Sequence, residues 1–257
     1  MDKQLIAERF ARARATYSRE ARVQQQVAEK MTTLLRSTLP DAHFDRIVEF
    51  GCGTGLYSRL IYDTWHPSLL HLNDLCPEMR FCLDSLTAWP GVTFEAGDAE
   101  TCPLPDRLDL LTSCSTLQWF VSPREFFRRS TSLLRPGGVL AFTTFGLSNL
   151  LEIRTLTGNG LDYTPPQQLR HELEDAGFRI LHLEQEEAVL HFPTPVDVLR
   201  HLRMTGVTGT EKHTWSRGRL QAFCDEYIRR FGSPKGVSLT YQPIYVICTI
   251  ENSELRS

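Results

Sequence analysis

The chain has 257 residues, of which 41% are hydrophobic and 23% are charged, and its formal net charge is −3. This length suits one large α/β domain or two small ones, and the composition is ordinary for a globular protein. The mild acidity argues against a dedicated nucleic-acid-binding domain, which would more often carry a basic excess or stripe.

The first half of the chain predicts a helical segment followed by an alternation of strands and helices. Residues 3–38 have a helical pattern, and Val23, Val27 and Met31 form a one-sided apolar stripe within it. Because each later strand is a continuous apolar run, the alternation indicates a parallel sheet with helices on both faces. The predicted strands are 46–50, 69–72, 92–94, 108–112 and 139–145, and the predicted helices are 56–62, 77–86 and 124–134.

The rhythm changes after Gly146. Helical patterns cover 149–156, 166–176, 195–204 and 215–231, and long strands are predicted at 178–190 and 237–250. We expect the late strands to complete the sheet and the helices between them to form a lid. Residues 1–257 are then a single domain, with N-terminal helices at 1–40, a cofactor-binding core at 41–147, lid insertions at 148–176 and 195–235, and final sheet strands at 177–194 and 236–257.

Cysteine usage and hydropathy indicate the compartment. The seven cysteines are scattered without a Cys-x-x-Cys pair, which is typical of reduced thiols and argues against a disulfide framework or a zinc site. The first residues lack the apolar core of a secretory signal, and no stretch approaches the roughly 18 apolar residues of a membrane span. We therefore expect a cytoplasmic protein with no metal, no membrane association and no nucleic-acid partner.

The central motif is Glu49-Phe50-Gly51-Cys52-Gly53-Thr54-Gly55, between a predicted strand and a predicted helix. Glycines let a backbone approach a ligand closely, and doubly wound sheets bind ligands beside such turns. A nicotinamide or flavin site expects G-x-G-x-x-G/A, but Leu56 stands where the third glycine of that motif would be. Glu49 would repel a pyrophosphate and attract an ammonium or a sulfonium. The loop therefore favours S-adenosylmethionine over a dinucleotide.

Two further acids follow the next two predicted strands. Asp74 ends the second strand, where a carboxylate can accept hydrogen bonds from both ribose hydroxyls; the alternative is a helix N-cap before Pro77. Asp98 follows the third strand and could accept a bond from the adenine amine; the alternative is a turn aspartate. Three acids after three successive strands favour the cofactor interpretation.

These motifs resemble those of the class I methyltransferases, which carry E-x-G-x-G-x-G, an acid after the second strand and G-D-A-E-x-L-P, matched here at 97–105. The resemblance implies a Rossmann-like, doubly wound α/β fold with a mostly parallel seven-stranded sheet, an antiparallel last strand, N-terminal helices and helical lid insertions. It implies S-adenosylmethionine as the cofactor, with Glu49 and the loop glycines at the methionine, Asp74 at the ribose, and Asp98 with Ala99 at the adenine. The implied cofactor-binding residues are Glu49, Gly51, Cys52, Gly53, Gly55, Asp74, Leu75, Asp98, Ala99 and Ser115.

A narrower resemblance is to the malonyl-acyl-carrier-protein O-methyltransferases, the family that opens pimelate-chain assembly for biotin. The pieces that point to it are Leu117-Gln118-Trp119, Phe142-Thr143-Thr144-Phe145 and Thr205-Gly206-Val207. Further matching pieces are 9–13 with Tyr17, 24–28, 202–204 and 239–245, so the resemblance covers nearly the whole chain.

This resemblance implies methyl transfer to the free carboxylate of a malonyl thioester, either malonyl-acyl-carrier protein or malonyl-coenzyme A. Such a carboxylate has a pKa of about 3–4 and needs no general base. Rate would come from positioning and from excluding water. Substrate candidates are Tyr17, Gln24 and Arg203, each of which could equally be a packing or a solvated helix residue. We predict no catalytic acid or base, and a lone histidine such as His201 is more often structural.

An acidic carrier protein would dock on a locally basic surface. Arginines cluster at 124, 128 and 129 and again at 217, 219, 229 and 230, although charge on exposed helices is usually only solvated. Two alternatives stay open for the whole chain. One is a methyltransferase for a quinone precursor or a dicarboxylic acid; carbon methylation of a phenol would need a base that we do not find. The other is a non-catalytic regulatory protein that binds the cofactor, although such proteins usually lose the glycine loop or the ribose acid.

Overall fold

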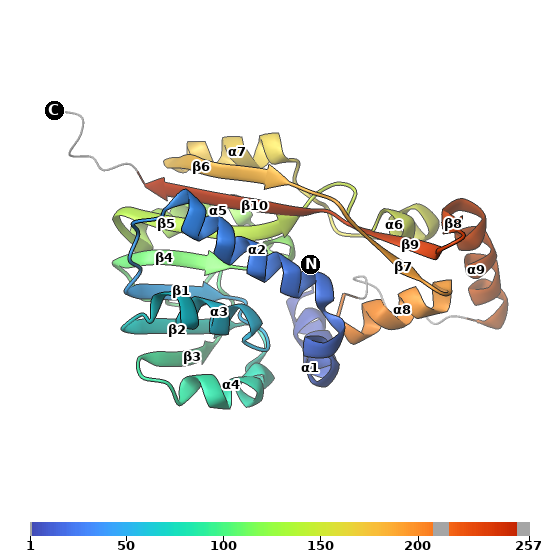
Figure 1. Cartoon of the computed structure of the whole chain (residues 1–257), viewed down its shortest axis with the longest axis horizontal. Helices are drawn as coiled ribbons and strands as arrows, with labels where there is room; N and C mark the ends of the chain where they lie inside the picture. The colour runs from blue at the N-terminus through green and yellow to red at the C-terminus, as the bar shows by residue number, and fades with distance from the viewer. Residues whose placement is uncertain (1, 208–215, 251–257) are drawn as a thin grey trace.

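The computed structural model describes residues 2–207 and 216–250, and every structural statement below refers to these ranges (Figure 1). Its large sheet is formed by β1 (Arg46–Phe50), β2 (Leu69–Asp74), β3 (Val92–Ala96), β4 (Leu108–Ser113), β5 (Leu134–Phe145), β6 (Phe178–Gln185) and β10 (Pro243–Ile250). The strand order is β3-β2-β1-β4-β5-β10-β6, and β10 runs antiparallel to both of its neighbours. The predicted seven-stranded, mostly parallel sheet with an antiparallel last strand is confirmed.

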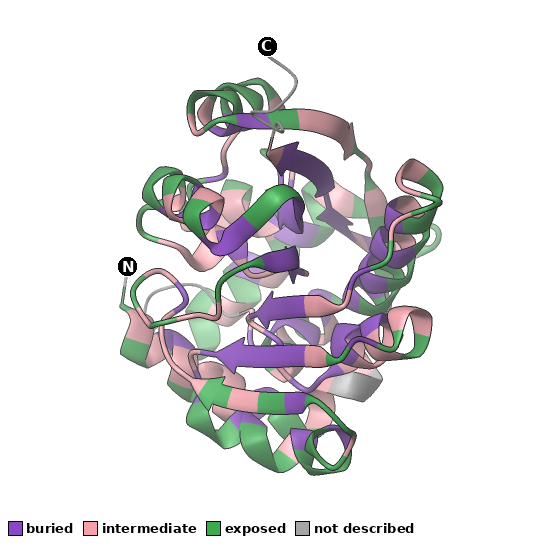
Figure 2. Cartoon of the chain, turned by 90° about the vertical axis from the view of Figure 1, so that its left-hand side faces the viewer, coloured by how far each residue is buried: buried purple, intermediate pink, exposed green. Residues whose placement is uncertain are grey.

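Helices cover both faces of this sheet. They are α2 (Arg22–Thr38), α3 (Leu56–Trp65), α4 (Arg80–Thr87), α5 (Pro123–Leu133) and α7 (Pro166–Asp175), with the 3₁₀ turns η1 (Pro77–Met79) and η2 (Leu117–Trp119). Because side chains alternate along a strand, Ile47 of β1 packs in one core with α2 and α3, and Val48 packs in a second core with α5 and α7. Figure 2 shows the buried strands between helices whose outer faces are exposed. Burying each such aliphatic side chain contributes about 1.5–3 kcal/mol.

The helix predicted over residues 3–38 is two helices that meet at Ala21. The first, α1 (Lys3–Glu20), begins after Asp2, whose side chain accepts a hydrogen bond from the backbone N–H of Leu5 at 3.0 Å. Ala21 leaves the helical region of backbone conformation, with φ −83° and ψ 48°, and α2 begins at the next residue. The apolar stripe of α2 packs on the sheet, whereas α1 turns away and contacts η1. The first helix therefore lies at the edge of the sheet where β1 to β4 end (Figure 1).

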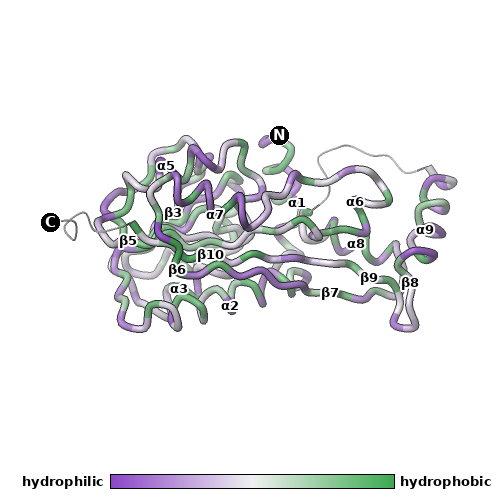
Figure 3. The backbone as a smooth tube through the Cα atoms, turned by 90° about the horizontal axis from the view of Figure 1, so that it is seen from above, coloured by the Kyte–Doolittle hydropathy of each residue, from purple (hydrophilic) through white to green (hydrophobic). Residues whose placement is uncertain are grey.

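The two late strands predicted at 178–190 and 237–250 do not run unbroken, and this prediction is wrong. The chain leaves the large sheet after β6 and forms β7 (Ala188–Phe192) in a separate antiparallel sheet. Similarly, β9 (Gly236–Tyr241) belongs to this small sheet, whose order is β7-β9-β8 with the short β8 (Gly232–Ser233), and only β10 belongs to the large one. Figure 3 shows the two sheets following one another along the molecule.

The physical reason for one of these breaks is the backbone of Gln242, between β9 and β10. Its N–H donates to the side chain of Asn149 at 3.2 Å, and its carbonyl accepts from the N–H of Gly146 at 2.8 Å. Both groups are therefore satisfied by the loop after β5 instead of by a neighbouring strand. The strand-like pattern continues on either side of Gln242, and the one local sign of the change is Pro243, which has no backbone N–H to donate to a neighbouring strand.

Three helices gather around the small sheet. They are α6 (Leu151–Thr157), α8 (Pro195–Met204) and α9 (Arg217–Phe231). By contrast, α7, which the sequence places among the insertions, packs against β6, because Leu169 and Leu173 are buried in the same core as Phe178. Trp215, at the predicted start of the last helix, lies outside the described residues, and the division into core and lid segments stays a prediction. Across residues 2–207 and 216–250, none of the helices has the length and apolar character needed to cross a bilayer.

Candidate functional site

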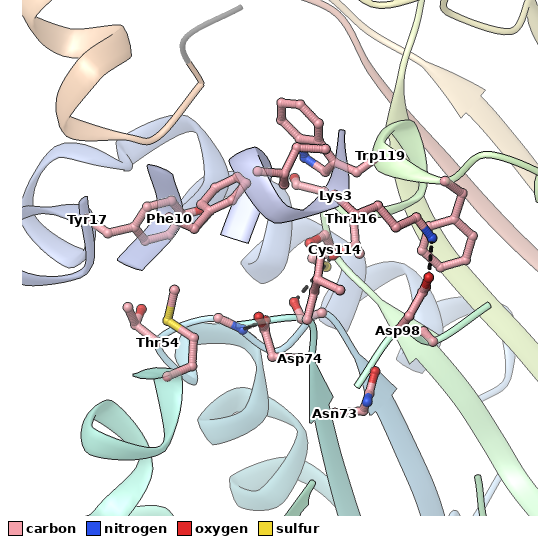
Figure 4. Close-up of a pocket in the computed structure, with 18 of the residues that line it drawn as sticks. Lys3, Phe10, Tyr17, Thr54, Asn73, Asp74, Asp98, Cys114, Thr116 and Trp119 are labelled. Carbon is pink, nitrogen blue, oxygen red and sulfur yellow. Dashed lines mark hydrogen bonds and ion pairs between the residues drawn. The ribbon is translucent and has the colours of Figure 1, made fainter. Parts of the chain in front are cut away.

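The carboxyl ends of β1, β2 and β4 meet beneath α1 and line a pocket of about 770 Å³, counting space open to solvent (Figure 4). Doubly wound sheets bind ligands at this edge because the loops there diverge and leave room. Seven of the ten predicted cofactor residues line it: Gly51, Gly53, Asp74, Leu75, Asp98, Ala99 and Ser115. The sequence thus identified the floor of the pocket, while Glu49, Cys52 and Gly55 lie outside its lining.

The glycine loop has a different task at each glycine. A Cβ on Gly53, which has φ +52°, would meet nothing within 4 Å, so the backbone faces open space in the pocket. A Cβ on Gly51 would fall 2.1 Å from Oγ1 of Thr116, so the loop packs directly on the chain after β4. A Cβ on Gly55 would fall 2.5 Å from the side chain of Leu86 on α4. Gly55 therefore permits close helix packing, whereas Gly51 and Gly53 line the pocket.

Asp74 fixes the loop against the next turn. One carboxylate oxygen accepts from the N–H of Gly53 at 2.8 Å, and the other accepts from the N–H of Cys76 at 2.8 Å. Asp74 is not the N-cap of η1, because Cys76 holds that position. Burial raises the pKa of Asp74 to about 6. A carboxylate has about four acceptor positions, so Asp74 can still accept from ligand hydroxyls.

Glu49 is a buried carboxylate below the loop. Its Oε2 has no hydrogen-bond partner within the described ranges. Burial raises its pKa to about 8; the nearby Ser58 hydroxyl lowers the pKa, and the charge of Asp74 raises it, both to a smaller extent. Buried charges are normally paired, so two neighbouring acids of this kind are suited to a positively charged ligand. A bound metal ion could also supply a positive charge, but the described part of the chain contains no group of three side chains that could hold one.

The far end of the pocket is closed by a residue of α1. Lys3 Nζ lies 2.5 Å from Oδ2 of Asp98 and also pairs with Glu100. The same ammonium lies 5.8 Å from the centre of the Phe120 ring. Glu100 in turn accepts from the N–H groups of Val121 and Ser122, at 2.9 and 2.6 Å. The predicted adenine acceptor Asp98 is therefore held in a charged network that joins α1 to the sheet.

The three predicted substrate residues lie in different places. Tyr17 lines the pocket, and burial raises the pKa of its hydroxyl, which stays protonated at neutral pH. Gln24 is buried, and its Oε1 has no partner in residues 2–207 and 216–250, but it does not line the pocket. Arg203 is exposed on the last turn of α8 and does not line the pocket either. Their roles stay predictions, and the position of Tyr17 alone fits one.

His201 is a structural residue in this fold. It is buried, and its Nε2 lies 2.9 Å from the hydroxyl of Tyr241. Burial lowers its pKa, so the ring is neutral at physiological pH. It does not line the pocket.

The arginine clusters are largely engaged in the structure. Arg124 pairs with Asp175 and Arg128 with Glu125, both at 2.9 Å. Arg129 donates to the backbone carbonyls of Ala99, at 2.8 Å, and Cys102, so it holds the loop that carries Asp98. Arg229 and Arg230 share Glu226, while Arg217 and Arg219 are exposed. The first cluster is thus partly a support of the pocket.

Sequence reasoning missed most of the residues that α1 contributes to the pocket. The missed lining residues are Lys3, Ile6, Phe10, Arg14, Thr54, Asn73, Met79, Cys114 and Phe120. Asn73 adjoins a predicted residue and could have been found by extension. The side chains of α1 could not, because Lys3 is 95 residues from Asp98 in the chain and no local pattern links them.

The known proteins to which the chain is similar are methyltransferases. The family described as "Methyltransferase domain" matches residues 48–142. A malonyl-acyl-carrier-protein O-methyltransferase of Bacteroides helcogenes is 54% identical over 270 residues, covering 96% of this chain and 98% of the relative. One of Haemophilus influenzae is 35% identical over 255 residues, covering 99% and 97%.

Solved structures agree at the level of the fold. A Bacillus halodurans protein described as a methyltransferase has a TM-score of 0.65 at 16% identity, covering 87% of this chain and 99% of that one. The Haemonchus contortus phosphoethanolamine N-methyltransferase 2, solved with S-adenosyl-L-methionine, has a TM-score of 0.55 at 17% identity, covering 87% and 52%. At these identities the likeness concerns the architecture alone.

Proposed function

The chain belongs to the malonyl-acyl-carrier-protein O-methyltransferases, and from this premise we propose that it methylates the free carboxylate of a malonyl thioester with S-adenosylmethionine. The product is the methyl ester that primes pimeloyl-chain synthesis for biotin. The observation that carries the proposal is 54% identity to such an enzyme over 96% of the chain. The pocket at the edge of the sheet supplies the chemistry that this activity requires.

The residues around the pocket fit the cofactor. When bound, S-adenosylmethionine supplies a methyl group on a positively charged sulfur. The unpaired Oε2 of Glu49 suits the ammonium of its methionine part, and Asp74 can accept the ribose hydroxyls. The open backbone at Gly53 leaves room for close approach. Asp98 and Ala99, at the other end, suit the adenine. These individual assignments are part of the proposal.

The chain needs to position the acceptor and exclude water. A malonyl carboxylate is ionised at neutral pH, so its oxygen forms the new C–O bond while the C–S bond breaks, and no proton moves. Aligning the two reactants in a site closed by α1 can account for much of the rate, since effective molarities of oriented groups are large.

We also propose which molecule carries the malonyl group and where in the cell the protein works. The relatives are named for malonyl-acyl-carrier protein, and we take this carrier as the partner, with malonyl-coenzyme A as the alternative thioester. A cytoplasmic location is supported by the seven cysteines, all of which are free. A quinone-precursor substrate is disfavoured because a phenol or carbon acceptor needs a base. A regulatory protein without catalysis is disfavoured by the intact glycine loop and Asp74.

One assay tests the function. The purified protein is incubated with labelled methyl donor and either malonyl-acyl-carrier protein, malonyl-coenzyme A or a quinone precursor. We expect label in a base-labile methyl ester of the malonyl group. Label on carbon, or transfer to the quinone precursor alone, would contradict the proposal.

A further inference from the structure

Two of the three sequence pieces that most specifically mark the family meet beside Phe10 of α1 in the structure. Trp119, from the first piece, and Phe10 of α1 pack edge to face with ring centres 5.6 Å apart and an interplanar angle of 88°. Gly206, from the third piece, has φ +73°, and a Cβ there would fall 2.9 Å from the ring of Phe10. None of these residues is needed for the shared cofactor motifs, so their convergence requires another explanation.

A second cavity lies at this junction, on the outer side of the aromatic pair. It measures about 270 Å³, counting space open to solvent. Ile6, Phe10 and Trp119 line both this cavity and the cofactor pocket, so the two share a wall. The remaining lining residues are Asp2, Leu5, Arg9 and Gly206. The cavity therefore lies between α1, η2 and the turn after α8, where the lid helices approach the core.

We propose that this second cavity binds the pantetheine arm of the malonyl thioester, with the Phe10–Trp119 pair as the passage into the cofactor pocket. The proposal rests on the function proposed above and adds the route by which the substrate reaches its site. Because the arm is long and the malonyl carboxylate is its tip, a productive groove must open at one end on solvent and at the other on the methyl donor. The two cavities share the wall formed by Phe10 and Trp119, so the malonyl group reaches the methyl donor when these two rings, which are in edge-to-face contact, move apart.

The residues that line the second cavity suit the uncharged part of the substrate, its pantetheine arm. Leu5, Ile6, Phe10 and Trp119 form apolar walls that suit the methylene groups of the arm. The rim carries one acid, Asp2, and one base, Arg9, so its formal charges cancel and it has no excess positive charge for a carboxylate or a phosphate. The arm has amides and methylenes but no charge, and it is the segment of the substrate that matches this lining.

The direction of the groove also agrees with the position of Tyr17. In Figure 4, Phe10 and Tyr17 lie together above Thr54 and Asp74, on the side of the pocket formed by α1. A carboxylate that passes between Phe10 and Trp119 therefore arrives beside a protonated hydroxyl. The absence of a side chain on Gly206 keeps the lid turn in contact with Phe10 without filling the cavity.

The test compares malonyl thioesters of graded arm length: malonyl-N-acetylcysteamine, malonyl-pantetheine and malonyl-coenzyme A. For the unaltered protein, we expect kcat/KM to rise at least about tenfold from the first to the second, since contacts with a few methylenes are worth this much. Leu5 lines only the second cavity and is half-buried. In Leu5→Trp the larger ring narrows the groove, and the ratio of the two kcat/KM values should fall by about tenfold. Affinity for S-adenosylhomocysteine, measured by calorimetry, reports that the variant is folded.

Gln4→Trp is the matched control, because Gln4 is the exposed neighbour of Leu5 on the same helix and lines neither cavity. Its ratio should equal that of the unaltered protein. Equal kcat/KM for the short and long thioesters in the unaltered protein would overturn the groove while leaving the proposed function intact, as would an unchanged ratio in Leu5→Trp. Failure to methylate any malonyl thioester would overturn the function and the groove together.

Discussion

Glu49 illustrates how one buried side chain couples ligand binding to protons. Without a partner for Oε2, and with a pKa raised to about 8 by burial, its carboxyl is mostly protonated at pH 7. A cationic ligand favours the ionised form and lowers this pKa. Binding at pH 7 should therefore release a proton from Glu49, and affinity should increase as the pH rises towards 8.

This linkage can be measured with Glu49→Gln. We expect the unaltered protein to release close to one proton when it binds S-adenosylhomocysteine at pH 7, and the variant to release almost none. Calorimetry in two buffers of different ionisation enthalpy gives the proton count directly. An equal count in both proteins would show that Glu49 does not face the ammonium.

Tyr17 is the one of the three substrate candidates that lines the pocket. Because burial raises its pKa, its hydroxyl remains a donor throughout the neutral range. Loss of one buried hydrogen bond to a charged group costs about 1.5–3 kcal/mol, so Tyr17→Phe should lower kcat/KM for malonyl-coenzyme A roughly 10- to 100-fold. Affinity for S-adenosylhomocysteine should change little.

Tyr62→Phe serves as the control for Tyr17→Phe. Tyr62 is half-buried on α3 and does not line the pocket. The centre of its ring lies 4.5 Å from the centre of the Trp89 ring. Removing the hydroxyl of Tyr62 should leave the methylation of malonyl-coenzyme A unchanged. If both variants lost activity equally, the effect of Tyr17→Phe would be one of folding.

At the scale of elements, the ammonium of Lys3 fastens α1 to the loops that line the pocket. Lys3 joins α1 to Asp98 and Glu100, and its side chain is 22% exposed, so solvent weakens each ion pair. Lys3→Met should increase the rate of S-adenosylhomocysteine release roughly three- to tenfold. Stopped-flow displacement measures this rate, and the difference between the two proteins should shrink in high salt because the pairs are screened.

Lys235→Met removes a matching exposed charge from the turn between β8 and β9. It should leave the release rate unaltered at every salt concentration. A release rate in Lys3→Met equal to that of the unaltered protein would mean that α1 is held over the pocket by its apolar contacts alone.

The elements also show where local sequence stops being informative. The strands from Arg46 to Phe145 were predictable because glycines and prolines separate short apolar runs with one period each. The break at Gln242 was not, because contacts with the distant loop at 146–149 redirect the chain there. The break at 186–187 falls in the polar run Glu184-Gln185-Glu186-Glu187, which the prediction of one long strand overlooked. The acids Asp74 and Asp98 were predictable from their place after strands, whereas Lys3 and Phe10 depend on how α1 folds back.

For the whole molecule, the acids of the site make stability depend on pH. Glu49 and Asp74 have folded pKa values of about 8 and about 6, above their ordinary values of 4.5 and 3.8. Both acids hold protons more tightly in the folded state. Their contribution is complete at low pH and is lost as the pH rises through 6 and then 8. The free energy of unfolding without ligand should thus decrease by an amount on the order of a few kcal/mol between pH 6 and pH 8.5.

Urea unfolding at the two pH values, with and without S-adenosylhomocysteine, measures this effect. The ligand should restore most of the stability at pH 8.5, and Glu49→Gln should reduce the pH dependence. An unfolding free energy that rises between pH 6 and pH 8.5 would contradict the assignment of buried, protonated acids.

Two strands pass without a loop from the large sheet into the small one, at 186–187 and at Gln242. The small sheet and the helices around it are thus joined to the large sheet by two segments that continue from strand to strand at these two points. Any tilt of the small sheet and its helices relative to the large sheet would move Gly206 relative to Phe10 while leaving the glycine loop in place. Substitutions at these two points should therefore change how the thioester is admitted without changing how the methyl donor is held.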